Sequence, residues 1–130
     1  MQYRPQNNDL IDAIQEFLLK EVLPFVKEND ALAYKTLVSW NMLGVVSREL
    51  KNGRPLLEAD ATLLAELLGE KAEVQTTGDR ELWQQAQALA KKAAQKVRAE
   101  QTMPGSAEWH AVKKLLTDNL QISNPRYGVE

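Results

Sequence analysis

The chain has 130 residues, of which 44% are hydrophobic and 26% charged, and its formal net charge is -2. A length of this order suits one domain, so we expect a single domain over residues 1–130. The lack of cysteine excludes disulfides, thiolate catalysis and cysteine-ligated metals, and the near-balanced charge argues against a nucleic-acid binder.

Apolar residues recur at helical spacing along the whole chain. The first helix is expected to begin after Asn7 or Asn8, and Pro24 should kink it or end it. The second is expected over residues 30–52, with Gly53 as its left-handed terminator. It is apolar on so many sides that we expect it to be buried on more than one of them.

Three further helices are expected in the second half of the chain. One follows Pro55 and ends at Gly69, because proline favours a helix start and glycine a helix end. The next spans residues 79–100, and the last is capped by Ser106. The connections are short, so the fold class predicted is all-α, a five-helix bundle with a long central second helix and an extended C-terminal tail. Residues 70–78 are the expected flexible loop.

Catalytic and metal-binding patterns are missing from the sequence. His110 is the only histidine, no G-x-S-x-G turn accompanies it, and Glu-x-x-His does not occur. The glycines are scattered and form no phosphate-binding loop. We therefore expect no enzyme, no metal and no cofactor. A locally basic stretch of the fourth helix is interpreted as a solvated face, with an acidic partner or a phosphate ligand as the alternative: Lys91, Lys92, Lys96 and Arg98.

Asn41 is the most informative polar residue, because it lies within the apolar run W-N-M-L-G-V-V. A buried amide must be hydrogen-bonded, so it could belong to a satisfied core network. Alternatively, Asn41 and Arg48, two turns further along the same side, could line a ligand pocket. Gly44 and Ser47 form a narrow strip where another backbone could approach closely.

The tail motif N-P-R-Y is the second candidate. In one interpretation it is a strap, in which Tyr127 packs on the bundle and Arg126 pairs with a helix carboxylate or a helix C-terminus. In the other, Arg126 and Tyr127 form an interface, since both residue types are enriched at binding hot spots.

Three stretches taken together resemble a known family. They are R-P-x(4)-L-I-D-A-I-Q-E-F-L-x(3)-V-L-P near the N-terminus, the central W-N-M-L-G-V-V-S-R-E-L and the closing L-Q-I-S-N-P-R-Y. This set resembles small bacterial helical domains of unknown function that occur beside or fused to aminoglycoside-phosphotransferase-like kinases and near acyl-CoA dehydrogenases. The resemblance implies a kinase-like or dehydrogenase protein partner, and it implies no catalytic residue.

The leading functional expectation is a non-catalytic accessory or regulatory module that binds such a partner and could pair as a homodimer. Asn41, Arg48, Arg126 and Tyr127 are its candidate site. The alternatives are a small-molecule binding protein with an acyl or phosphorylated ligand in an interhelical pocket, and an enzyme that uses carboxylates with Arg48. No leader pattern and no run of about 18 apolar residues is present, so a cytoplasmic protein without a membrane span is expected.

Overall fold

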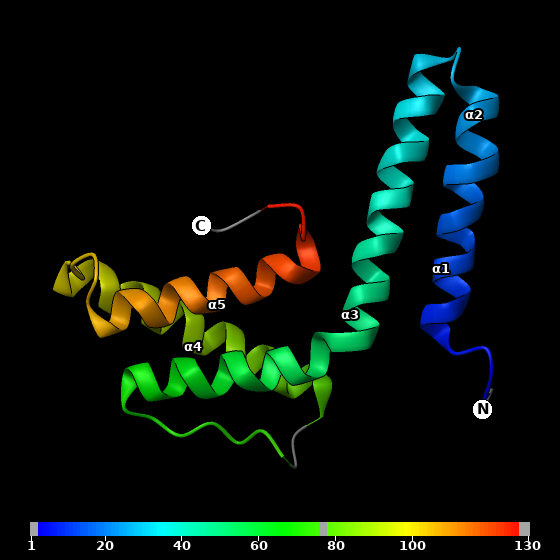
Figure 1. Cartoon of the computed structure of the whole chain (residues 1–130). Helices are drawn as coiled ribbons and strands as arrows, with labels where there is room; N and C mark the ends of the chain where they lie inside the picture. The colour runs from blue at the N-terminus through cyan, green and yellow to red at the C-terminus, as the bar shows by residue number, and fades with distance from the viewer. Residues whose placement is uncertain (1–2, 76–77, 128–130) are drawn as a thin grey trace. The chain divides into compact units, whose positions relative to one another are not determined.

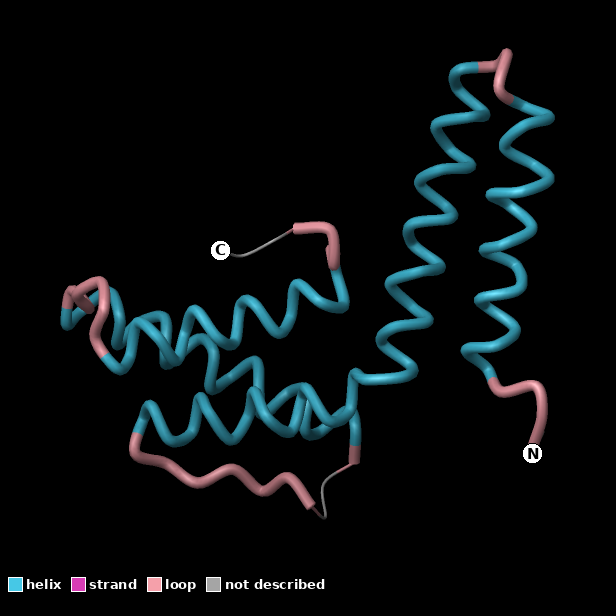
Figure 2. Tube along the Cα trace, viewed as in Figure 1, coloured by secondary structure: helices cyan, strands magenta, loops and turns pink. Residues whose placement is uncertain are grey.

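The computed structural model describes residues 3–75 and 78–127, where all regular structure is helical (Figure 2). The all-α class predicted from the sequence is therefore confirmed. Within these residues the chain forms four continuous helices rather than the five predicted, because two of the predicted helices are one. None of these helices combines the length and the hydropathy that a membrane span needs.

The first helix has three consecutive parts. They are α1 (Asn7–Phe17), the π-helical turn η1 (Leu18–Val22) and α2 (Leu23–Val26). The Leu23 N–H donates to the Leu18 carbonyl five residues back, which widens the turn. The wide turn immediately precedes Pro24, which has no N–H to donate. The helix therefore continues past the proline to Val26 instead of ending there.

The predicted second and third helices are one element, α3 (Asp30–Leu68). The predicted break is wrong, because Gly53 is helical and Pro55 lies inside the helix. A proline inside a helix costs about 3 kcal/mol. Beyond Pro55 the helix places Ala61, Leu64 and Ala65 in a hydrophobic core. Burial of about 0.8 kcal/mol per methyl group and about 1.5–3 kcal/mol for the leucine is comparable to that cost.

The chain divides into two compact units, Met1–Gly53 and Arg54–Glu130, and α3 runs from one into the other. In the first unit, α1, η1 and α2 lie antiparallel beside the first part of α3, so this unit is a helical hairpin (Figure 1). The single domain expected over residues 1–130 stays a prediction.

The second unit contains the end of α3 together with α4 (Asp79–Glu100) and α5 (Ala107–Ser123). Gly69 ends α3 with a φ of 69°, and the Trp109 N–H donates to the Ser106 hydroxyl at 3.2 Å, as the sequence predicts. Alanines let the helices approach closely. The core consists of Ala61, Leu64, Ala65, Leu82, Ala86, Leu89 and Ala93.

Candidate functional site

A polar seam joins α1 to α3 within the hairpin. The buried Ser47 hydroxyl donates to Asp12 Oδ1 at 2.5 Å, and Lys51 Nζ lies 2.8 Å from Asp12 Oδ2. These two hydrogen bonds hold the pKa of Asp12 below its ordinary value, the one from Lys51 contributing most. Asp12 therefore stays ionised and connects the two helices of the hairpin.

Gly44 leaves room for a side chain of the first helix. The Gln15 side chain crosses it and donates from Nε2 to the Trp40 carbonyl at 3.0 Å. A Cβ on Gly44 would lie 2.6 Å from that Nε2 and 3.0 Å from an Arg48 guanidinium nitrogen. Gly44 and Ser47 are both buried, but the atoms nearest a Cβ on Gly44 belong to the side chains of Gln15 and Arg48. The close approach of another backbone at this strip stays a prediction.

Asn41 is exposed, so the buried core amide predicted for it is wrong. The reason is that this part of α3 is apolar nearly all round, and its pattern does not reveal which side faces α1. Arg48, one of the other candidates, is half-buried over Gly44. A ligand site at Asn41 and Arg48 stays a prediction, and neither of the two grooves described below is lined by them.

Residues 124–127 form a turn rather than the extended tail predicted, and the last part of that predicted tail, residues 128–130, lies outside the described residues. The Tyr127 N–H donates to the Asn124 carbonyl at 3.0 Å, and the Tyr127 side chain is 63% exposed. The packing of Tyr127 against the bundle, expected for a strap, is therefore wrong. Arg126 is exposed and makes an interaction within the chain. Both residues belong to the second unit, whereas Asn41 and Arg48 belong to the first.

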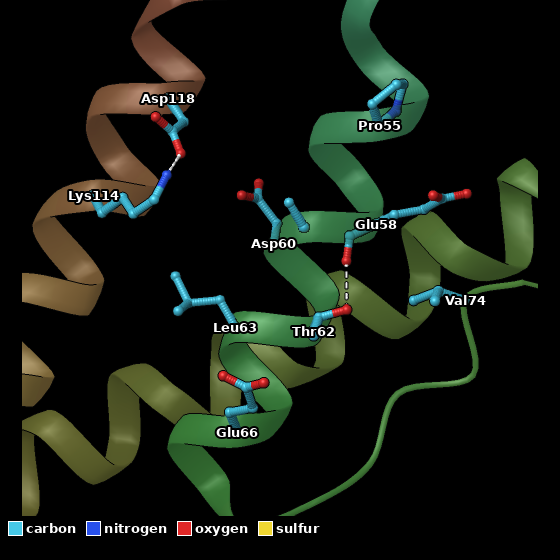
Figure 3. Close-up of a pocket in the computed structure, with 10 residues that line it drawn as sticks. Pro55, Glu58, Asp60, Thr62, Leu63, Glu66, Val74, Lys114 and Asp118 are labelled. Carbon is cyan, nitrogen blue, oxygen red and sulfur yellow. Dashed lines mark hydrogen bonds and ion pairs between the residues drawn. The ribbon is translucent and has the colours of Figure 1, made fainter.

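An acidic groove of about 470 Å³ lies in the second unit between α3 and α5 (Figure 3). Asp60 on α3 lies on the side facing α5, where Lys114 and Asp118 form an ion pair. Burial raises the pKa of Asp60, although a hydrogen bond from Asn119 Nδ2 at 2.7 Å acts in the opposite direction. The hydrogen bond from Asn119 to Asp60 joins α5 to α3, whereas Lys114 and Asp118 pair within α5. Asp60 therefore already has a structural role.

A second, more apolar groove lies between α4 and α5 and measures about 360 Å³. We call it the α4–α5 groove. Its size lies in the range of about 300–1,000 Å³ typical of small-ligand pockets. It is lined by Val97, Thr102, Trp109, Val112, Lys113 and Leu116.

Trp109, which lines the α4–α5 groove, contacts two neighbouring residues of α5, and one of them, Lys113, also lines the groove. Lys113 Nζ lies 5.1 Å from the centre of the Trp109 ring, and the His110 ring meets Trp109 edge-on at 5.0 Å. Leu116, which also lines the groove, is 57% exposed. The groove therefore offers an apolar surface with a single cation at its edge, which suits an apolar group next to an anionic one.

Arg54, which lies between two of the predicted helices, has a role that the sequence did not predict. Its guanidinium reaches Glu58 and Asp79, each at 2.6 Å, and donates to the Val74 carbonyl at 2.8 Å. It thereby joins α3, the following loop and the start of α4. Asp79 and Val74 are distant from Arg54 in the sequence, and no local pattern predicts these contacts.

Two of the four basic residues of the fourth helix have partners inside the second unit. Lys92 pairs with Glu70 at 3.0 Å, and Lys96 Nζ donates to the Leu67 carbonyl at 2.8 Å. An ammonium group at the C-terminal end of α3 is stabilising, because that end of a helix carries partial negative charge. Part of the basic stretch therefore serves the fold.

Comparison with known proteins identifies a family but no relative of known activity. No curated protein and no solved structure matches the chain. The family model described as "Domain of unknown function (DUF6285)" matches residues 27–127, which include all of α3, α4 and α5. The match covers well over half of the 130 residues. The chain therefore belongs to the DUF6285 family.

Proposed function

We propose that this chain is a non-catalytic accessory module of the bacterial cytoplasm that acts with another protein. The partner would be an aminoglycoside-phosphotransferase-like kinase or an acyl-CoA dehydrogenase. The choice of these partners follows from the family that the three sequence motifs resemble. The α4–α5 groove is the observation that carries the proposal, because it is an open apolar surface next to a tryptophan.

The chemistry of the groove suits a protein partner. Leu116 is 57% exposed, and Met103, next to the groove residue Thr102 in the chain, is 72% exposed. Tryptophan is enriched among the residues that dominate binding energy, and methionine adapts to differently shaped partners. An apolar side chain of the partner would enter beside Trp109, and a carboxylate next to it would meet Lys113.

Titration calorimetry with purified proteins tests the proposal. The chain is titrated with the kinase-like protein and with the dehydrogenase from the same organism. Leu116→Lys should weaken binding at least tenfold, because it places a charge in the groove. Gln121→Lys adds the same charge at an exposed position of α5 outside the groove and should leave binding unchanged. Equal binding by both variants, or no binding of either candidate, would contradict the proposal.

A small ligand is the second candidate function, and Lys113 is the observation that favours it. The acyl chain of an acyl-CoA would occupy the apolar part of the groove, and the phosphates of its CoA part would be attracted to the Lys113 ammonium group. Octanoyl-CoA should then raise the melting temperature, whereas free CoA and octanol should raise it less. Lys113→Gln should reduce the shift. A shift with octanoyl-CoA and no binding of either protein would favour this function over the first.

A further inference from the structure

Three cations form one row along α4, apart from the contacts that hold the second unit together. They are Arg80, Lys91 and Arg98, and all three are exposed. At about 100° per residue they fall within about 20° of one another around the helix. Within the described part of the chain none of the three forms an ion pair, in contrast to Lys92, which pairs with Glu70. We call these three residues the cationic row.

The carboxylates of α4 do not neutralise the cationic row. Asp79 is paired within the second unit, and the Glu81 side chain turns back toward Gly78, where a Cβ would lie 2.5 Å from its Oε2. Glu100 lies about 160° from Arg98 around the helix, on the side opposite the row. The row therefore presents positive charge to solvent over about 27 Å, which is the rise of 18 helical residues at about 1.5 Å each.

The cationic row lies beside the α4–α5 groove. Val97, which lines the groove, is about 100° from the row around α4, and the core residue Ala93 is about 40° further in the same direction. Between the row and Val97 this helix presents the exposed and uncharged residues Trp83, Gln87 and Ala94. A ligand that fills the groove and leans on α4 would therefore meet the row along its edge.

Lys113 supplies a cation on the other side of the groove. It lines the groove, and its Nζ lies 5.1 Å from the centre of the Trp109 ring. The carboxylates of α5, Glu108 and Asp118, each lie about 140° from Lys113 around the helix, and Asp118 is paired with Lys114. An apolar groove thus has positive charge on both of its sides.

This pattern matches an amphipathic helix that carries carboxylates beside its apolar stripe. In helix-in-groove recognition, the apolar stripe of one helix lies in an apolar groove of its partner. The cations of the row are 11 and 7 residues apart, and two α-helices that lie side by side share the same rise per residue. Glutamates at the same spacings on the bound helix would each meet one cation of the row.

A nucleic acid or an anionic membrane fits this surface less well. Both attract proteins through an excess of positive charge, and polybasic membrane-binding segments contain about 4–8 Lys or Arg residues. The chain has a formal net charge of -2, and α4 presents a single line of three cations. The charge pattern therefore favours a protein helix.

We propose that the α4–α5 groove and the cationic row together bind an acidic amphipathic helix of the partner protein. This inference rests on the proposed function, because it names the part of the partner that the groove takes. A synthetic helix of the same chemistry should bind as well, so the proposal can be tested without the partner.

Fluorescence anisotropy with two labelled peptides tests the proposal. Each is a helix of about 22 residues, or about 33 Å, with a leucine stripe, and the residues beside the stripe are glutamate in one peptide and glutamine in the other. The glutamate peptide should bind at least tenfold more tightly in about 20 mM salt, and its advantage should shrink in about 0.5 M salt because salt screens exposed charges. Equal binding of the two peptides, or no binding of either, would overturn the proposal.

Charge reversal on α4 locates the binding surface. The double variant Lys91→Glu, Arg98→Glu should weaken binding of the glutamate peptide at least tenfold. Lys35→Glu with Lys71→Glu is the matched control, because it changes the net charge equally at exposed positions outside the groove and the row. It should leave binding within about twofold of the wild type. Equal weakening by both double variants would overturn the proposal, because it would show attraction to the overall charge alone.

The same measurements separate this inference from the proposed function. Binding of the kinase-like protein or the dehydrogenase without binding of the glutamate peptide would refute the acidic helix and leave the proposed function standing. Binding of the peptide without binding of either protein would support the acidic helix and refute the named partners. Duplex DNA or phosphatidylglycerol vesicles that bind more tightly than the peptide, and are lost with Lys91→Glu, Arg98→Glu, would overturn the proposal in favour of a phosphate ligand.

Discussion

Asp12 should contribute more to the stability of the hairpin than its partial exposure implies. Its side chain is 43% exposed, and a surface ion pair with Lys51 alone would contribute about 0.2–1 kcal/mol. The Ser47 hydroxyl differs, because Ser47 is only 2% exposed and donates to the carboxylate at 2.5 Å. A hydrogen bond to a charged group contributes about 1.5–3 kcal/mol.

These contributions predict an order for three variants. Asp12→Ala should lower the free energy of unfolding by about 2–3 kcal/mol, because it removes both contacts and leaves a buried hydroxyl without its acceptor. Ser47→Ala should cost about 1 kcal/mol, since water can still solvate the half-exposed carboxylate. Lys51→Ala should cost less than about 1 kcal/mol.

Urea unfolding followed by circular dichroism at 222 nm, at one protein concentration throughout, measures these differences. Lys20→Ala is the control, since its partner Glu16 lies on the same helix and both side chains are largely exposed. It should leave the midpoint unchanged. If Lys51→Ala costs as much as Asp12→Ala, the ion pair and not the buried hydrogen bond stabilises the seam, and the reasoning is refuted.

Four further predictions concern the second unit and the seam. Leu82→Ala, at a fully buried position, should cost about 2–5 kcal/mol in urea unfolding, and a cost below about 1 kcal/mol would contradict its place in the core. Burial raises the folded-state pKa of Asp60, so this group's contribution to stability decreases as the pH rises from ~3.9 through the raised pKa. At pH 7 the urea midpoint of Asp60→Asn should therefore equal or exceed that of the wild type, and this advantage should disappear in acid. The folded-state pKa of Asp12 is lowered, so its stabilisation is present above pH ~3.9 and is lost as the pH falls through the lowered pKa. The urea midpoint of Asp12→Asn should therefore lie below that of the wild type at pH 7, and this difference should shrink in acid. A difference that grows in acid would contradict this. Arg54→Gln should speed tryptic cleavage after the exposed Lys71 several-fold, because it frees the loop that Arg54 holds through the Val74 carbonyl; an unchanged rate would argue against that contact.

Helix ends were predictable wherever local chemistry determines them. The bounds of α4, the cap at Ser106 and the left-handed turn at Gly69 agree with the sequence, because each depends on a few neighbouring residues. Gly53 and Pro55 carry the same signals but lie inside a helix. There the packing of the following residues in the core outweighs local preference, and packing partners are not visible in a single sequence.

The candidate site was less predictable than the fold. The strip at Gly44 and Ser47 was predicted because small residues permit close approach, but its partner Asp12 is 35 residues away from Ser47. Asn41 was misplaced because a helix that is apolar on many sides has no single inner face in the sequence. The α4–α5 groove depends on the distance between two helices, and no residue pattern in the sequence predicts that distance.

Hydrogen exchange of the chain, free and bound to the kinase-like or dehydrogenase partner, tests the proposed function most directly. If the α4–α5 groove is the binding surface, backbone amides in residues 97–102 and 109–116 should exchange more slowly in the complex, and those of the hairpin should not change. Protection confined to the hairpin, with unchanged exchange around Trp109, would contradict it.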